Sequence, residues 1–199
     1  MIGRTELFHL TLSWVVLGFA FSFSVGNVFS APRELPLSFA ISLLTVGLGF
    51  ILHELAHKFV AQKFGYWAEF RLSPMGLVMA VLFATITGGR LIFAAPGATY
   101  IIPKSGSFGY EVEHRESAIV SLAGPLTNIV LALGFFILPT NFLLLRLVKQ
   151  IGFSINIWLA AFNMLPFGGL DGQKVFSWNK ILWVAVAIPI FAAVAIFIF

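Results

Sequence analysis

The stretch GFILHELAHKFVAQKFG (residues 49–65) places two histidines and a glutamate directly after an apolar run. The uncharged run that leads into it, Leu35–Leu52, contains no Asp, Glu, Lys or Arg. Ionisable groups are costly at membrane depth, and a chain that keeps them there uses them for a function by default. The stretch therefore raises two questions: whether lipid surrounds this chain, and what chemistry His53, Glu54 and His57 perform.

The composition answers the first question. Hydrophobic residues make up 59% of the 199 residues and charged residues only 10%, and the mean hydropathy is +0.98. A soluble domain carries about 25% charged residues, so the solvent for most of this surface must be lipid. The net charge of +4 comes from basic residues in short loops, as in cytoplasmic loops, and does not indicate nucleic-acid binding. The absence of cysteine excludes disulfides, thiolate catalysis and Cys-ligated zinc.

Uncharged runs define the expected architecture. Five of six are long enough for a spanning helix of about 20 residues, once the histidine stretch extends the second. The third is doubtful because Pro74 and Gly76 shorten its helical part. The runs are Leu7–Pro32, Leu35–Leu52, Leu72–Gly89, Ser117–Leu145, Ile151–Leu170 and Ile181–Phe199. They predict an all-α polytopic membrane protein with about six transmembrane helices, forming one integral-membrane domain over residues 1–199 without a separate soluble domain. We interpret the first run as a retained helix and not as a signal peptide.

One segment between these runs has a different character. RLIFAAPGATYII (residues 90–102) has short apolar stretches on either side of a Pro-Gly turn. This pattern predicts an extended strand or a short membrane-associated β-hairpin. Such a strand either offers its edge to a peptide substrate or is a plain structural hairpin.

The histidine stretch has the spacing of a metal site. His53 and His57 are four residues apart, so on a helix both imidazoles reach a single ion from one face. Glu54 lies about a third of a turn from His53 and can take a proton from water on that ion. The alternative is a helix end with stray polar residues, which the preceding apolar run disfavours.

Two histidines leave a catalytic zinc ion one protein ligand short of the usual three. Asp171 is the only aspartate in the chain and follows the fifth apolar run directly, in FNMLPFGGLDGQKV (residues 162–175). Pro166 must end or kink the preceding helix. A carboxylate at this position is either the third metal ligand or the N-cap of the final helix.

Three stretches together resemble the site-2 protease family of intramembrane zinc metalloproteases (peptidase family M50). They are HELAH at 53–57, SLAGPLTN at 121–128 and NMLPFGGLDG at 163–172. Their order and their alternation with apolar runs also match, and the resemblance covers a catalytic core of about residues 40–175. It implies one Zn²⁺ per chain and the hydrolysis of peptide bonds within or near transmembrane segments of other proteins.

The resemblance also implies roles for single residues: zinc ligation by His53, His57 and Asp171, catalytic base for Glu54, and substrate or oxyanion binding for Asn128 and Asn163. Two positions depart from the family pattern without removing a ligand. Gly169 stands where many members have a second proline, and Gln173 replaces a frequent glycine. The residues alone leave another interpretation of Asn128 open, because a buried amide needs a partner and a neighbouring helix can supply one.

The order of the runs places all three motifs on one side of the membrane. Lys58, Lys63 and Arg71 follow the histidine stretch, so we expect a multi-pass protein of the cell membrane with its active site nearer the cytoplasmic side. The expected partners are the lipid bilayer and a transmembrane protein substrate, without nucleic acid, and an adaptor protein is left open. Two rival functions are an ion or metal transporter that uses the His/Asp cluster and an inactive membrane scaffold.

Overall fold

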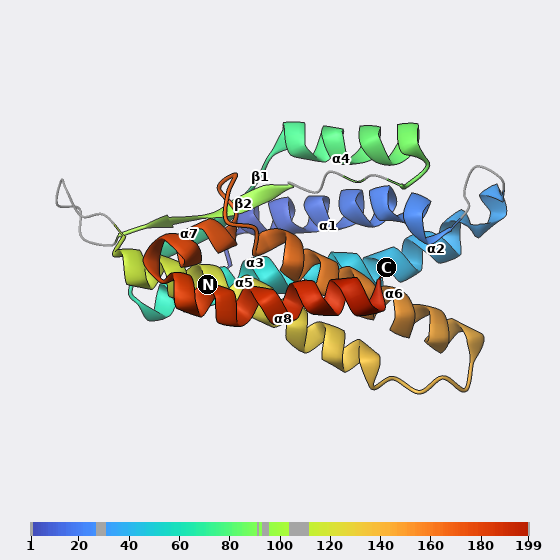
Figure 1. The fold of residues 1–199 in the computed structure, drawn as a ribbon. Coiled ribbons are helices and arrows are strands. Elements are labelled where there is room, and N and C mark those ends of the chain that lie inside the picture. The colour runs from blue at the N-terminus through green and yellow to red at the C-terminus, as the bar shows by residue number, and fades with distance from the viewer. Residues whose placement is uncertain (1, 27–30, 91, 93–95, 104–111, 199) are drawn as a thin grey trace. The chain divides into compact units, whose positions relative to one another are not determined.

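The computed structural model describes residues 2–26, 31–90, 92, 96–103 and 112–198, and they are mostly helical (Figure 1). The chain divides into two compact units. The first unit consists of Met1–Ile51 and Glu69–Tyr100, and the second unit of Leu52–Ala68 and Ile101–Phe199. Each unit has helices of its own around its own buried residues.

Five helices in the described part of the chain are long and apolar enough to cross a membrane. They are Arg4–Val25, Pro32–Lys63, His114–Phe136, Leu143–Asn163 and Lys180–Phe197. The third uncharged run forms only α4 (Pro74–Thr87), a helix of 14 residues. At about 1.5 Å per residue it is roughly 21 Å long, against about 30 Å of hydrocarbon. The predicted helical membrane fold is therefore confirmed, with five candidate spans and one shorter apolar helix.

In the first unit, α1 (Arg4–Val25) packs against the beginning of the second candidate span. That span begins with η1 (Pro32–Glu34), α2 (Leu35–Ser42) and the π-helical turn η2 (Leu43–Gly47). The indole Nε1 of Trp14 donates a hydrogen bond of 2.9 Å to the Leu43 carbonyl oxygen. A Cβ atom at Gly47 would lie 2.2 Å from the Trp14 ring, so only glycine allows this close approach. The span then continues without a break into α3 (Leu48–Lys63), which carries the histidines.

A two-stranded antiparallel sheet joins β1 (Trp67–Leu72) to β2 (Gly97–Ile102). The strand predicted within residues 90–102 is confirmed over β2, whereas residues 91 and 93–95 lie outside the described part. Its partner is β1, with α4 between the two strands in sequence. The sequence analysis did not identify β1, although its residues 68–72 alternate between apolar and polar and Ala68 and Phe70 are buried.

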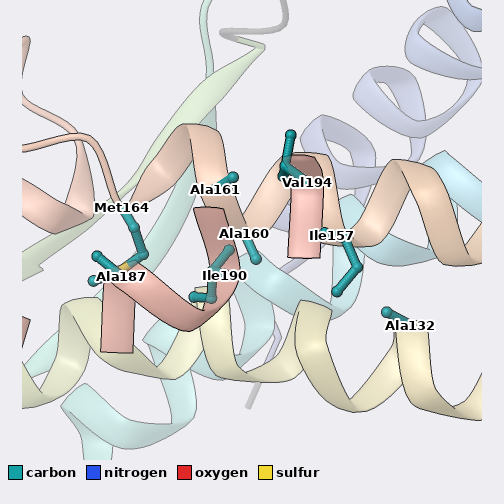
Figure 2. Packing of buried hydrophobic residues seen from close by; sticks show 8 residues of the cluster. All are labelled: Ala132, Ile157, Ala160, Ala161, Met164, Ala187, Ile190 and Val194. Atoms are coloured by element: carbon teal, nitrogen blue, oxygen red, sulfur yellow. The ribbon is translucent and has the colours of Figure 1, made fainter. Parts of the chain in front are cut away.

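The second unit contains α5 (His114–Phe136), α6 (Leu143–Asn163), α7 (Asp171–Trp178) and α8 (Lys180–Phe197). Small and branched side chains from α5, α6 and α8, together with Met164, form a buried cluster (Figure 2). Small side chains allow close approach of helix backbones in lipid. The cluster consists of Ala132, Ile157, Ala160, Ala161, Met164, Ala187, Ile190 and Val194. This packing fixes the end of α6, from which the turn to Asp171 departs.

The structure tests the prediction that Asp171 is the N-cap of the final helix. The final helix α8 has Asn179 as its N-cap, whose Oδ1 accepts a 2.9 Å hydrogen bond from the Leu182 backbone N–H. Asp171 is instead the first residue of the separate short helix α7. The N-cap alternative is therefore wrong, and the Asp171 carboxylate is available for other contacts.

Candidate metal centre

Three side chains of the second unit meet at one buried point. The Oδ2 atom of Asp171 lies 3.3 Å from Nε2 of His53 and 3.1 Å from Nε2 of His57. The two Nε2 atoms are 3.0 Å apart, and one ligand atom from each residue falls within 4.8 Å of the others. The side chains are only 6%, 8% and 12% exposed for His53, His57 and Asp171. The two distant motifs of the sequence thus form a single cluster.

The rings of the two histidines are fixed by hydrogen bonds from α3 to α5. Nδ1 of His57 donates to the Val120 carbonyl oxygen at 2.7 Å, and Nδ1 of His53 donates to Oδ1 of Asn128 at 2.6 Å. A neutral imidazole carries one proton, so a proton on each Nδ1 leaves each Nε2 with a free electron pair. When both rings are neutral, the short contact between the two Nε2 atoms therefore joins two acceptors, and it becomes favourable only with a proton or a cation between them.

This donor set fits a metal ion. Two imidazole nitrogens and a carboxylate oxygen point their electron pairs at one another, an arrangement that only a proton or a cation among them can stabilise. Three protein ligands of these types with a fourth position left open are typical of catalytic zinc sites. Gly124 on α5 keeps that space open, because a Cβ there would lie 2.4 Å from Nε2 of His57 and 2.5 Å from Nε2 of His53.

The surroundings keep the Asp171 carboxyl ionised. Burial alone raises its pKa, but when a proton occupies the cluster, the charge on His57 and the hydrogen bonds from His53 and His57 outweigh this effect. The pKa of Asp171 therefore lies well below its usual value, so the group is a carboxylate at neutral pH, the form that binds metals.

Backbone geometry brings Asp171 to the cluster. Gly168 and Gly169 have φ angles of 72° and 78°, in the left-handed region that side chains disfavour. Gln173 accepts a 2.8 Å hydrogen bond from the Gly169 backbone N–H at its Oε1 and so closes the turn. A Cβ at Gly172 would lie 2.2 Å from the Met164 carbonyl oxygen, so glycine allows α7 to begin directly against the end of α6.

The remaining predicted site residues lie at different places. Glu54 follows His53 on α3, is 9% exposed, and its carboxylate lies within electrostatic range of His57. Asn128 contacts the cluster through His53. Asn163 is the last residue of α6, and its Nδ2 donates a 3.0 Å hydrogen bond to the Leu159 carbonyl oxygen of the same helix. The roles proposed for these three residues stay predictions.

Asn156 is a further polar residue of this region that the sequence analysis did not identify. It is fully buried, and its Oδ1 accepts a 2.9 Å hydrogen bond from Nδ2 of Asn128. The sequence signal was present, since Asn156 is an amide within an apolar run, as Asn128 is. No local pattern indicates the carbonyl of Val120 as a partner of His57, because only the packing of α5 against α3 reveals it.

The fold and the cluster together define a class: a helical membrane protein with a buried His/His/Asp site of the kind that binds zinc. "Putative zinc metalloprotease MJ0611" of Methanocaldococcus jannaschii is 40% identical over 191 residues, which cover 94% of this chain and 92% of that protein. "Putative zinc metalloprotease YwhC" of Bacillus subtilis is 31% identical over 150 residues, covering 68% of this chain and 67% of that protein.

A third relative, "Putative zinc metalloprotease Rip2" of Mycolicibacterium smegmatis, is 32% identical over 156 residues, covering 69% of this chain and 58% of that protein. No family model matches the sequence, and no solved structure matches it. The chain belongs to the family of these zinc metalloproteases, the site-2 protease family. The resemblance inferred from the three motifs is confirmed.

Proposed function

We propose that this protein is an intramembrane zinc metalloendopeptidase that hydrolyses peptide bonds within or near transmembrane segments of other membrane proteins. One observation carries the proposal: His53, His57 and Asp171 converge on one buried point, with Glu54 beside them on α3. Membership of a zinc metalloprotease family supports zinc as the metal. The five candidate spans support a multi-pass protein, and we propose the cell membrane as its location, with the site nearer the cytoplasmic side.

In this proposal different residues bind the metal, transfer the proton and bind the oxyanion. His53, His57 and Asp171 hold one zinc ion, which when bound polarises a carbonyl group and makes water acidic enough to lose a proton near neutral pH. Glu54 takes the proton from the attacking water and passes it to the leaving amine. Asn163 donates a hydrogen bond to the developing oxyanion, because the buried Asn128 amide is already bonded to Asn156 and to His53.

A substrate helix must unwind first, because its backbone groups are bonded to one another. We propose that the unwound segment pairs with the edge of β2, by β-strand addition. In the first unit, the outer edge of β1 is already occupied, since the Phe70 backbone N–H donates a 3.1 Å hydrogen bond to Oε1 of Glu6. Tyr100 and Ile102 of β2 are 59% and 54% exposed. A plain structural sheet is the alternative to this role.

The decisive experiment replaces the proposed base. Glu54→Gln keeps the size of the side chain and removes its ability to accept a proton. We expect this variant to bind zinc as wild type does and to lose cleavage of a panel of single-span proteins in proteoliposomes. Glu34→Gln is the matched control, because Glu34 is exposed and should leave both measurements unchanged. Undiminished cleavage by Glu54→Gln would remove Glu54 from its role.

The ligand assignment has a separate test. Asp171→Ala should lower the zinc content of the purified protein, and full zinc occupancy would move the third ligand elsewhere. Zinc flux across proteoliposomes without any cleavage would favour a transporter, and neither flux nor cleavage would favour an inactive scaffold.

A further inference from the structure

We propose that Asn156 is a positioning residue that fixes the protonation pattern of His53 through Asn128, an inference that rests on the proposed zinc site. Three hydrogen bonds connect the helices in series. Nδ2 of Asn156 donates to the Gly152 carbonyl oxygen at 2.8 Å, and Oδ1 of Asn156 accepts from Nδ2 of Asn128 at 2.9 Å. Oδ1 of Asn128 then accepts from Nδ1 of His53 at 2.6 Å.

The donors and acceptors of this series of hydrogen bonds can be arranged in only one way, which we call its direction. The Gly152 carbonyl oxygen can only accept, so Asn156 must turn its NH₂ group toward it and its oxygen toward Asn128. Asn128 must then present NH₂ to Asn156 and its oxygen to His53. An oxygen facing Nδ1 of His53 requires the proton on Nδ1, which leaves the electron pair of Nε2 for the metal. A backbone carbonyl of α6 thus determines which nitrogen of a histidine on α3 can bind zinc.

Burial makes this direction obligatory. Asn128 and Asn156 are both 0% exposed, and a buried amide without a partner is costly. Reversing either amide would place two oxygens or two NH₂ groups face to face. The direction of the series is therefore fixed by the fold.

The two histidines differ in what they depend on. His57 donates directly to a backbone carbonyl, that of Val120, so its protonation pattern needs no side chain. His53 reaches a backbone carbonyl only through two amide side chains. A change at Asn156 should therefore affect His53 and leave His57 as it is.

Two substitutions separate positioning from a merely structural role. Asn156→Leu is close in size but cannot accept from Asn128, whereas Asn156→Asp still accepts from Asn128 and so keeps the direction of the series. A buried carboxyl next to a carbonyl oxygen should lower the thermal stability of Asn156→Asp at least as much as that of Asn156→Leu. Positioning predicts the opposite order for zinc affinity, with Asn156→Asp binding more tightly than Asn156→Leu.

The first measurement is the zinc dissociation constant of the full chain in detergent, by competition with a chelator. We expect Asn156→Leu to bind zinc roughly 10- to 100-fold more weakly, as is usual when a partner of a metal ligand is lost. Thr127→Val is the matched control. It removes a hydroxyl next to Asn128 whose hydrogen bond, among the described residues, stays within α5, to the Ala123 carbonyl oxygen at 2.8 Å. This variant should leave the constant unchanged. In an Asn128→Ala background, Asn156→Leu should add no further loss.

The second measurement does not need zinc. In protein labelled with ¹⁵N-histidine, His53 should carry its proton on Nδ1 in wild type and in Asn156→Asp, and on a mixture of both nitrogens in Asn156→Leu, with His57 unchanged in all three. Unchanged zinc affinity and an unchanged His53 spectrum in Asn156→Leu would overturn the proposal, as would an affinity order that follows stability. A wild-type protein that binds no zinc would contradict the proposed function, and the His53 spectra would still decide this inference.

Discussion

The two halves of the metal centre reach the same point by different physical means. On α3, the histidine rings are aimed by hydrogen bonds to groups of α5. Asp171 is positioned by the path of the backbone. Gly168 and Gly169 have left-handed φ angles, and Gly172 lies in close contact with the end of α6. The histidine half should therefore be sensitive to changes in the polar partners and in the surface of α5. The aspartate half should be sensitive to added carbon atoms in the turn.

The largest effect is expected where α5 faces both rings. Gly124→Ala places a Cβ about 2.4–2.5 Å from Nε2 of His57 and of His53, so both rings must move. We expect zinc affinity to fall by about 100-fold or more, beyond the usual effect of losing one partner, as measured by chelator competition.

Gly134→Ala is the matched control for that change. Gly134 is also on α5, but a Cβ there would have no atom within 4 Å. Alanine should leave zinc affinity unchanged and stabilise the helix by up to about 1 kcal/mol. Equal zinc affinities of the two variants would contradict the role of Gly124 in leaving space at the site.

A smaller effect, confined to the aspartate half, is expected from Gly172→Ala. The added Cβ would lie 2.2 Å from the Met164 carbonyl oxygen, so α7 must shift and carry Asp171 away from the histidines. We expect the zinc affinity of this variant to fall to that of Asp171→Ala, with the His53 and His57 ¹⁵N signals retained. Lys174→Ala is the control, on the exposed face of the same helix, and it should change neither the zinc affinity nor the ¹⁵N signals. Wild-type zinc affinity in Gly172→Ala would show that the turn tolerates a side chain.

The smallest effect is expected at Gln173, one of the departures from the family pattern. Gln173→Ala removes the acceptor of the Gly169 N–H, and an exposed hydrogen bond of this kind contributes about 0.5–1 kcal/mol. We expect a few-fold weaker zinc binding, measured in the same assay. Gln173→Glu keeps an acceptor and should restore wild-type affinity; a failure of glutamate to do so would point to the amide group itself.

The same contrast explains what the sequence could predict. The histidine pair could be found because its spacing of four residues is local and its apolar context is unusual. Asp171 could be proposed because it is the only aspartate and follows a run that Pro166 ends. The five candidate spans follow from length and composition alone.

The missing parts depend on contacts between distant segments. The direction of the amide series at Asn128 and Asn156 follows from a backbone carbonyl of α6, which carries no sequence signal. The pairing of β1 with β2 joins strands separated by α4, so neither strand indicates its partner locally. The alternation of apolar and polar residues over 68–72 was a signal for β1 that the sequence analysis missed. The short helix α7 was not expected because the turn and the final helix appeared continuous in sequence.

The convergence of three electron pairs on one point has a consequence for the maturation and degradation of the protein. Before a newly inserted chain captures its ion, only a proton can hold these three atoms together, so loading must displace that proton. Ligand binding at a concentration 100-fold above the dissociation constant adds about 2.7 kcal/mol to stability. Maturation and resistance to degradation should therefore follow zinc supply, and thermal unfolding with zinc and with a chelator would measure that dependence.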